Sequence, residues 1–356
     1  MRIVVMPGDG IGPEITAATV EVLAAASHGF GLGLAFERHE VGFARLKAKG
    51  ATLAPDLVQL CREADGMLLG PISHSDYPPR AEGGINVSSE LRVKLDLYAN
   101  IRPARTREAL PHWGRTPMDL VIVRENTEGF YADRNMFMGI GEFMPDPDMA
   151  LSVRKVTAKG SSRIARTAFE LARKRRRKVT GVHKVNVLRI SEALFLREVR
   201  KVAREFPDVE YEEQLIDSMS ALLVRDARRF DVVVTTNMFG DILSDEASEL
   251  SGSLGLGGSI NAGAAHCMAQ AQHGSAPDIA GEDKANPTSL ILSAAMLLEW
   301  LSAQHGNDAF ARAHRAIERA VDRLLADPGR RTPDLGGKLG TRAFANALCT
   351  ELRSPK

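Results

Sequence analysis

The feature that most constrains the fold of this chain is the repeated alternation of short apolar segments with longer segments of helical periodicity. Five short runs rich in apolar and β-branched residues predict buried strands, at residues 3–6, 66–69, 120–123, 179–182 and 232–235. Polar or glycine-bearing residues follow each run. Alternation of strands and helices in this way indicates an α/β architecture.

Length, charge and cysteine content limit the possible classes of protein. The 356 residues suffice for about two domains. With 46 Lys and Arg against 45 Asp and Glu, the formal net charge of +1 argues against a protein devoted to nucleic acid or to an anionic membrane. The three widely separated cysteines exclude a disulfide scaffold and fit a reducing compartment. Because no apolar run is long enough to span a membrane, we expect a soluble cytoplasmic protein.

Three further segments have distinctive composition. Residues 137–157 lack helical periodicity and contain glycines and prolines, which predicts an extended arm or hairpin. Residues 289–303 are apolar almost all round, which predicts a buried helix. The basic run 173–178 could be a nucleic-acid patch, but its position before a predicted strand favours a solvated helix end.

Two aspartates after the last predicted strand form a candidate metal site. If a helix begins near Gly240, Asp241 and Asp245 lie one turn apart on the same face. Such like charges repel unless a cation lies between them, although acids near a helix N-terminus also interact favourably with its dipole. Asp217 could add a third ligand. Carboxylate donors without His or Cys favour Mg²⁺ or Mn²⁺ over Zn²⁺.

Arginines at predicted element ends form a candidate anion site. Arg92 lies in a helical stretch, Arg102 follows the strand-like residues 97–100, and Arg124 follows residues 120–123. Each could simply form a surface salt bridge. Together, beside acidic residues suited to a metal, their planar forks suit a substrate with several carboxylates.

A tyrosine and a lysine near that candidate metal site are possible proton donors and acceptors. Tyr131 closes the segment 124–131, and Lys184 lies in His183–Asn186, which follows another predicted strand. A nearby divalent cation depresses the pKa of such groups. The alternative is a packed tyrosine and a lysine that covers apolar surface with its methylene stem.

The glycine-rich segments do not match a dinucleotide-binding Rossmann motif. Gly8, Gly10 and Gly12 follow a predicted strand, but Pro13 breaks the GxGxxG pattern. Two later segments, 252–263 and 273–281, are rich in small residues that could let the backbone approach a nucleotide closely.

These motifs, in this order, resemble those of the β-decarboxylating dehydrogenases, which include isopropylmalate, isocitrate, homoisocitrate and tartrate/D-malate dehydrogenases. The resemblance covers essentially the whole chain. It is carried by segments 8–14, 91–103, 124–131, 183–186, Asp217, 236–245, 273–281, 285–287 and 331–337.

The resemblance implies a two-domain, non-Rossmann α/β fold with the active site in the cleft between the domains. One domain, on the cofactor side, would combine residues 1–99 with 252–356. The second, for dimerisation and catalysis, would comprise residues 100–251, with the arm near 137–157 joining a homodimer.

The resemblance also assigns roles to individual residues. Arg92, Arg102 and Arg124 would hold the malate part of the substrate, and Asp241 and Asp245 would bind the metal. Lys184, as proton acceptor, and Asp217 would be contributed by the partner subunit, and Tyr131 would support protonation of the product. Asn86, Ser88 and Asn186 complete the expected substrate contacts.

The expected cofactor is NAD. The pair Asp278 and Ile279 resembles that of NAD-dependent members, whereas NADP-preferring relatives carry Lys and Tyr there. A carboxylate accepts hydrogen bonds from ribose hydroxyls and repels a 2′-phosphate. The other expected cofactor contacts are Ile11, His273, Gly274, Ser275, Ala276 and Asn286.

Two departures from the family pattern concern the substrate and the cofactor loop. Gln270, Ala271 and Gln272 replace the common Glu-Pro-Val that precedes His-Gly. Where isopropylmalate enzymes carry a leucine pair, this chain has Ser88 and Ser89, which suit a polar substituent at C3 of the substrate.

The sequence therefore predicts an NAD- and metal-dependent dehydrogenase that oxidatively decarboxylates a 3-substituted (R)-malate. Its overall length and its 331–337 segment suit the isopropylmalate/homoisocitrate side of the family, whereas the polar pocket suits isocitrate, homoisocitrate, tartrate or D-malate. A catalytically silent regulatory subunit is an alternative of another class, which the presence of the expected catalytic residues disfavours.

Overall fold

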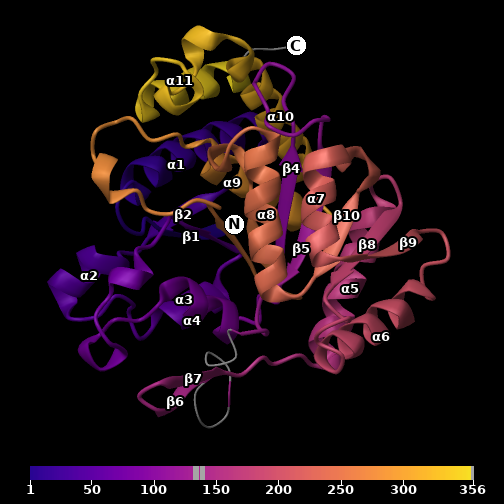
Figure 1. Ribbon diagram of the computed structural model, residues 1–356. Helices are drawn as coiled ribbons and strands as arrows, with labels where there is room; N and C mark the ends of the chain where they lie inside the picture. The colour runs from indigo at the N-terminus through magenta and orange to yellow at the C-terminus, as the bar shows by residue number, and fades with distance from the viewer. Residues whose placement is uncertain (131–135, 137–140, 354–356) are drawn as a thin grey trace.

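The structure, a computed structural model, describes residues 1–130, 136 and 141–353. A mixed ten-stranded sheet runs through the molecule in the order β2-β1-β3-β12-β11-β4-β5-β10-β8-β9, with helices on both faces (Figure 1). Most neighbouring strands are parallel, but the pairs β12–β11, β11–β4 and β4–β5 are antiparallel. The strands of this sheet are β1 (Arg2–Met6), β2 (Ala35–Arg38), β3 (Gly66–Leu69), β4 (Ala99–Arg105), β5 (Asp119–Glu125), β8 (Lys178–His183), β9 (Glu210–Leu215), β10 (Val232–Thr235), β11 (Ile260–Ala262) and β12 (Cys267–Gln270).

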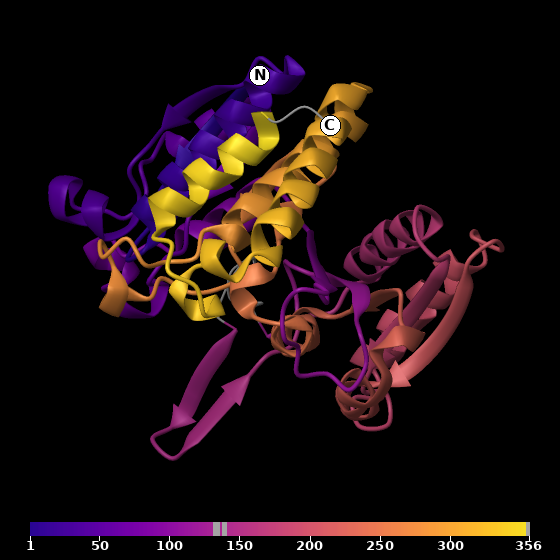
Figure 2. The same cartoon turned by 90° about the horizontal axis from the view of Figure 1, so that it is seen from above.

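Eleven α-helices in the described part of the chain cover this sheet. Helices α1, α10 and α11 pack together on one side, as the view from above shows (Figure 2). The helices are α1 (Gly12–Phe30), α2 (Gly42–Lys49), α3 (Leu57–Glu63), α4 (Val87–Lys94), α5 (Ala158–Arg173), α6 (Ser191–Ala203), α7 (Ile216–Asp226), α8 (Asn237–Ser251), α9 (Thr288–His305), α10 (Asp308–Ala326) and α11 (Thr341–Arg353). None of the helices described is long and apolar enough to cross a membrane.

All five predicted strands are confirmed. Strands β3 and β10 are buried along their whole length, because helices cover both faces of a parallel sheet and so favour continuous apolar runs. Two boundaries were wrong. The strand expected at residues 97–100 is β4, which continues to Arg105, so Arg102 lies within the strand rather than after it. The backbone of Asp96 is left-handed (φ +50°), and seven residue pairs with β5 then fix the strand. Strand β5 continues to Glu125, so Arg124 also lies within its strand rather than after it.

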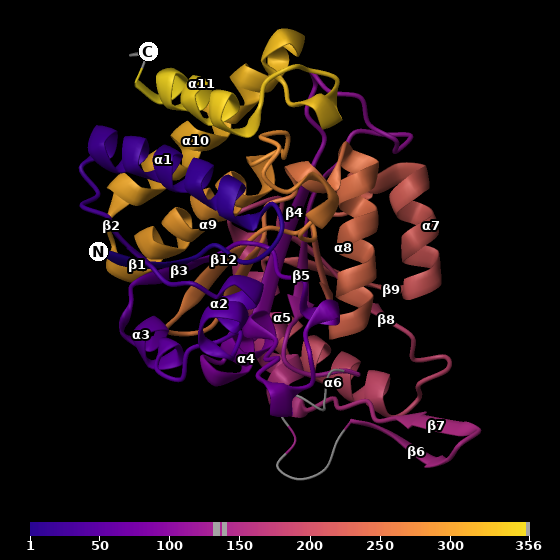
Figure 3. The same cartoon turned by 90° about the vertical axis from the view of Figure 1, so that its left-hand side faces the viewer.

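The predicted arm is confirmed in its described part. Strands β6 (Glu142–Asp146) and β7 (Met149–Ser152) form an antiparallel hairpin that projects from the body of the molecule (Figure 3). Residues 137–140 of the predicted arm lie outside the described residues. Every residue of the two strands is exposed in the single chain.

The other two sequence interpretations also agree with the structure. Helix α9 is buried on nearly all sides, as the apolar segment 289–303 predicted. The basic run 173–178 joins the end of α5 to β8. Arg173 pairs with Asp208, and Arg175 and Arg176 pair with Asp119, so these cations are engaged within the chain.

Four hydrophobic clusters support the sheet. Two lie around strands β1, β3 and β12, and two around β5, β8 and β10. Strands β4 and β11 connect these halves through continuous hydrogen bonding. The domain boundaries expected at residues 99/100 and 251/252 stay a prediction.

Candidate active site

A polar pocket of about 260 Å³ opens between the two halves of the sheet. Its walls come from α4, β4, β5, α8 and the segment that follows β12. Arg92, Arg102 and Arg124 all line it, together with Asp241. The three arginines predicted from separate elements therefore converge on one cavity.

Arg102 anchors the pocket to helix α8. Its side chain is buried, and its Nη1 donates to Ser244 Oγ at 2.8 Å and to Asp245 Oδ1 at 3.0 Å. The same nitrogen lies 3.3 Å from Asp241 Oδ1. Since one guanidinium nitrogen contacts both carboxylates, the two aspartates face the same side of α8, as their spacing predicted.

Arg124 holds the start of the same helix. Its Nη1 pairs with Asp241, while Nε and Nη2 donate to Asn237 Oδ1 at 2.9 and 2.6 Å. Asn237 in turn donates to the Glu128 carbonyl at 2.9 Å. A Cβ on Gly240 would lie 2.6 Å from the Arg124 side chain, so a residue without a side chain is needed there for the close approach of α8.

Asp241 and Asp245 suit a hard divalent cation such as Mg²⁺ or Mn²⁺, which prefers oxygen ligands. Asp241 lines the pocket, and Asp245 contacts Arg102 of the pocket wall; the two side chains are partly exposed, at 35% and 48% of their area. No group of three or more His, Cys, Asp or Glu suited to a metal occurs in the described part of the chain. The expected third ligand, Asp217, therefore does not join this pair within one chain.

The wall formed by α4 is hydrophilic. Ser88 Oγ donates to Gln270 Oε1 at 3.0 Å, and Arg92 Nη2 donates to the same oxygen at 3.1 Å. Asn86 caps the helix by accepting from Ser89 N at 3.0 Å. All of these residues line the pocket, and Ser88, Ser89 and Gln270 are buried, so this wall offers hydroxyl and amide groups in place of an apolar surface.

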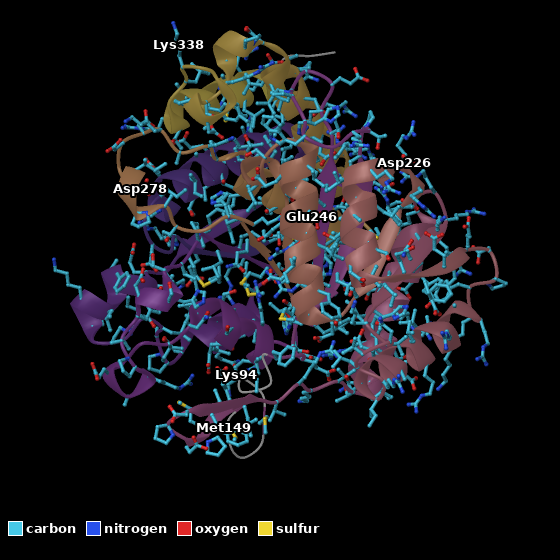
Figure 4. The ribbon with its side chains drawn as sticks, viewed as in Figure 1. Lys94, Met149, Asp226, Glu246, Asp278 and Lys338 are labelled. Atoms are coloured by element: carbon cyan, nitrogen blue, oxygen red, sulfur yellow. The ribbon has the colours of Figure 1, made fainter. Side chains whose placement is uncertain are left out.

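The expected cofactor residues lie on two neighbouring loops. Ile11 N donates to the Ser275 carbonyl at 2.8 Å, and a Cβ on Gly10 would lie 1.9 Å from that oxygen, so the loops touch. Ala276 is left-handed (φ +36°), a conformation costly for a residue with a side chain. It precedes the turn that exposes Asp278, labelled in Figure 4.

His273 and Asn286 are two further candidate residues for cofactor binding. His273 lines the pocket; burial lowers its pKa, and its Nε2 is a buried atom without a partner among the described residues. Such an unsatisfied nitrogen fits a site completed by a ligand. Asn286 Nδ2 donates to Asp334 Oδ2 at 2.9 Å. Gly274 and Ile279 lie on the same loop as His273.

Lys184 and Asp217 lie elsewhere and do not line the pocket. Lys184 Nζ contacts Asp217 Oδ1 at 2.7 Å, and this hydrogen bond holds the pKa of Asp217 below its usual value. Asn186, in the turn after Lys184, is exposed. Tyr131 lies outside the described residues.

Sequence reasoning missed several groups that complete the pocket. Asn237 and Ser244 hold the arginines, His74 lines the rim, and Gln272 contacts Asp245. Gln272 stood out only as a departure from the family pattern. Asn237 and Ser244 lie in the segment 236–245, but the sequence gave them no role, because their contacts with Arg124 and Arg102 join residues more than a hundred positions apart. His74 gave no local signal.

Comparison with known proteins identifies the family. A family model described as isocitrate/isopropylmalate dehydrogenase matches residues 2–350. The chain is 41% identical over 355 residues to the isocitrate/homoisocitrate dehydrogenase of Thermus thermophilus, covering 99% of both chains. It is 42% identical over 343 residues to the 3-isopropylmalate dehydrogenase of Moorella thermoacetica, covering 94% of this chain and 93% of that protein. The crystal structure of isocitrate dehydrogenase from Methylococcus capsulatus matches with a TM-score of 0.87 and 40% identity over 99% of both chains.

The fold and the pocket of converging arginines and aspartates are those of a decarboxylating dehydrogenase. The chain belongs to the isocitrate/isopropylmalate dehydrogenase family, as the order of its motifs predicted.

Proposed function

We propose that this protein oxidatively decarboxylates a 3-substituted (R)-malate, with NAD as hydride acceptor and Mg²⁺ or Mn²⁺ as the metal. The observation that carries the proposal is the convergence of Arg92, Arg102 and Arg124 with Asp241 in one polar pocket. Three guanidinium groups match a substrate with at least two carboxylates, and each fork can bind a carboxylate through two hydrogen bonds.

Different residues of the site bind the substrate, bind the metal and transfer protons in this proposal. The arginines hold the carboxylates of the malate unit, and Asp241 and Asp245 hold the divalent cation. When bound, the cation acidifies the C2 hydroxyl and offsets the negative charge that develops during reaction. Lys184, in its neutral form, would accept the hydroxyl proton, with Asp217 beside it, and Tyr131 would support protonation of the product.

Because Lys184 and Asp217 do not line the pocket of their own chain, we infer a homodimer in which each copy supplies them to the other. The surface beside them supports this arrangement. Val187 and Ile190 are 65% and 88% exposed next to Lys184, and large exposed apolar side chains in a single chain mark an interaction site.

The hairpin arm extends the proposed dimer interface. Phe143 and Met144 on β6, and Met149 and Leu151 on β7, are each at least 43% exposed. Met149 is labelled on the projecting arm in Figure 4. Pairing with the arm of a second copy would cover this apolar surface and the open edges of a two-stranded sheet.

The charges of the cofactor loop favour NAD over NADP. Asp278 is exposed in the turn after Ala276, where a carboxylate would accept from ribose hydroxyls and repel a 2′-phosphate. The cation nearest in sequence, Lys284, is already paired with Glu282 at 2.6 Å. Asp334 adds further negative charge beside Asn286.

The α4 wall favours a C3 substituent that forms hydrogen bonds. Ser88 and Gln270 present polar atoms where an isopropyl group would need an apolar contact. These polar atoms bond one another within the wall, and an apolar substituent would displace water from them without adding a hydrogen bond, so it would bind less well there than a polar one. Isocitrate, homoisocitrate and tartrate, which carry a polar group at C3, therefore fit this pocket better than isopropylmalate. D-malate has no C3 substituent and so only avoids the unfavourable apolar contact. A silent regulatory subunit would have no need of the paired Lys184 and Asp217.

The test is NADH production at fixed Mg²⁺ with isocitrate, homoisocitrate, D-malate, tartrate and isopropylmalate, repeated with NADP⁺. We expect the highest kcat/KM with a substrate that carries a polar C3 group, and with NAD. In the variant Ser88→Leu, the preference should shift toward isopropylmalate, whereas Ser75→Leu, on the exposed surface, should leave it unchanged. A wild-type preference for isopropylmalate would contradict the polar-pocket argument, and no turnover of any substrate would support the silent subunit.

A further inference from the structure

Gln272 joins the cofactor loop to the metal-binding helix. Its side-chain Nε2 donates to Asp245 Oδ1 at 3.0 Å and to the Ser244 carbonyl at 2.9 Å. Its Oε1 accepts from Ser248 Oγ at 3.1 Å. The side-chain amide of Gln272 therefore contacts three residues of α8, and Gln272 directly precedes His273 in the expected cofactor loop.

The surroundings hold this amide in place. Gln272 N donates to Ser289 Oγ at 3.2 Å, which ties the backbone to α9, and Ser289 Oγ donates to the Gly257 carbonyl at 2.6 Å. A Cβ on Gly257 would lie 2.4 Å from Gln272 Oε1. The space beside the amide is therefore available only because residue 257 has no side chain.

The contacts hold Asp245 through only one of its two carboxylate oxygens. Oδ1 accepts from both Arg102 and Gln272, whereas no hydrogen bond involves Oδ2 among the residues described. The Asp245 side chain is 48% exposed. Two donors on one oxygen fix the carboxylate plane and present the other oxygen to a ligand.

We propose that Gln272 is a positioning residue that orients Asp245 for the divalent cation and couples metal binding to dinucleotide binding. This inference rests on the proposed function, because it takes Asp245 as a metal ligand and 273–286 as the cofactor loop. NAD bound to that loop would further restrict Gln272, which its contacts with α8 and α9 already hold, and Gln272 would in turn restrict Asp245. Such coupling is reciprocal, so Mn²⁺ would tighten NAD binding by the same factor.

The test is calorimetric titration of the full-length protein with Mn²⁺, with and without saturating NAD. In the wild type we expect tighter Mn²⁺ binding when NAD is present. The variant Gln272→Met keeps the length of the side chain but removes the donor. It should weaken Mn²⁺ binding about tenfold or more, and the effect of NAD on that affinity should disappear.

A matched control and a second variant separate this role from a general structural one. Gln59→Met removes another glutamine-to-carboxylate hydrogen bond, between Gln59 and Glu63 on the exposed face of α3, and should change neither affinity nor coupling. Ser248→Ala leaves Gln272 in place but frees its Oε1, and should weaken Mn²⁺ binding in the same direction by a smaller factor.

The outcomes distinguish the two proposals. Mn²⁺ affinity and coupling within twofold of wild type in both Gln272→Met and Ser248→Ala would overturn the role of Gln272 and leave the proposed function intact. A wild-type protein that binds neither Mn²⁺ nor NAD would overturn the proposed function itself.

Discussion

The arginine–aspartate pocket and the Lys184–Asp217 pair differ sharply in their surroundings. In the pocket, Arg102 and Arg124 are buried and held by several contacts from α8 within the same chain. The Lys184–Asp217 contact is a single ion pair in which the Asp217 side chain is 62% exposed. Under the proposed function, the chain holds its substrate-binding groups internally, whereas the proposed proton-transfer groups lie on a surface with exposed apolar neighbours. The comparison therefore predicts that binding depends on contacts within one chain and turnover on a contact between two.

The largest expected effect comes from the exposed pair. Lys184→Met should lower kcat about 10³-fold, the scale of general acid–base catalysis, with little change in the affinity for substrate or NAD. Steady-state kinetics and NAD titration would measure both. Lys201→Met, which removes another exposed lysine–carboxylate contact, is the matched control and should keep full activity. A large loss of substrate affinity with unchanged kcat would contradict the separation of the two regions.

A pH titration sharpens the same comparison. Lys184 holds the pKa of Asp217 below its usual value, so Asp217 stays ionised at lower pH than a free aspartate. In Lys184→Met that pKa should rise toward the ordinary value, which carboxylate chemical shifts can follow. The pair's favourable contribution to the free energy of unfolding is present above pH 3.8, and it is lost as the pH falls through the lowered pKa of Asp217. An unchanged Asp217 titration in the variant would mean that the pair does not form in solution.

The buried region should respond through substrate binding. Arg124→Met removes a fork that holds both Asp241 and Asn237, and should raise KM about 100-fold, since hydrogen bonds to charged groups are the strong ones. Arg229→Met, at an exposed position outside the pocket, serves as the control. An unaltered KM for the Arg124 variant would exclude it from the substrate site.

A smaller effect is expected at the cofactor loop. Asp278→Lys should shift the ratio of kcat/KM for NAD and NADP about tenfold toward NADP, because a cation attracts the 2′-phosphate that a carboxylate repels. Asp278→Asn removes the repulsion without adding a cation, so its ratio of kcat/KM should fall between those of the wild type and Asp278→Lys. An unchanged ratio in both variants would remove Asp278 from cofactor selection.

Much of this architecture could be predicted from the sequence because it is encoded locally. Strands β3 and β10 match their apolar runs, and the four-residue spacing of Asp241 and Asp245 placed both on one face of α8. Strand β4 was predicted less well, because its register comes from pairing with β5 rather than from its own composition.

The parts that could not be predicted depend on contacts between distant residues. Gln272 meets Asp245 across 27 positions, and Arg124 meets Asn237 across 113, with no local pattern to announce either contact. The family resemblance supplied roles for Lys184 and Asp217, but only the structure shows them paired with each other and apart from the pocket.

The central claim is that each active site combines the pocket of one chain with Lys184 and Asp217 of a second. Subunit complementation tests it most directly: Lys184→Met and Arg124→Met are purified separately, unfolded together and refolded as a mixture. In a twofold symmetric dimer, random mixing yields half heterodimers with one intact site each, so the account predicts recovery of about a quarter of wild-type activity. A mixture no more active than the two variants alone, with heterodimers demonstrably formed, would contradict it.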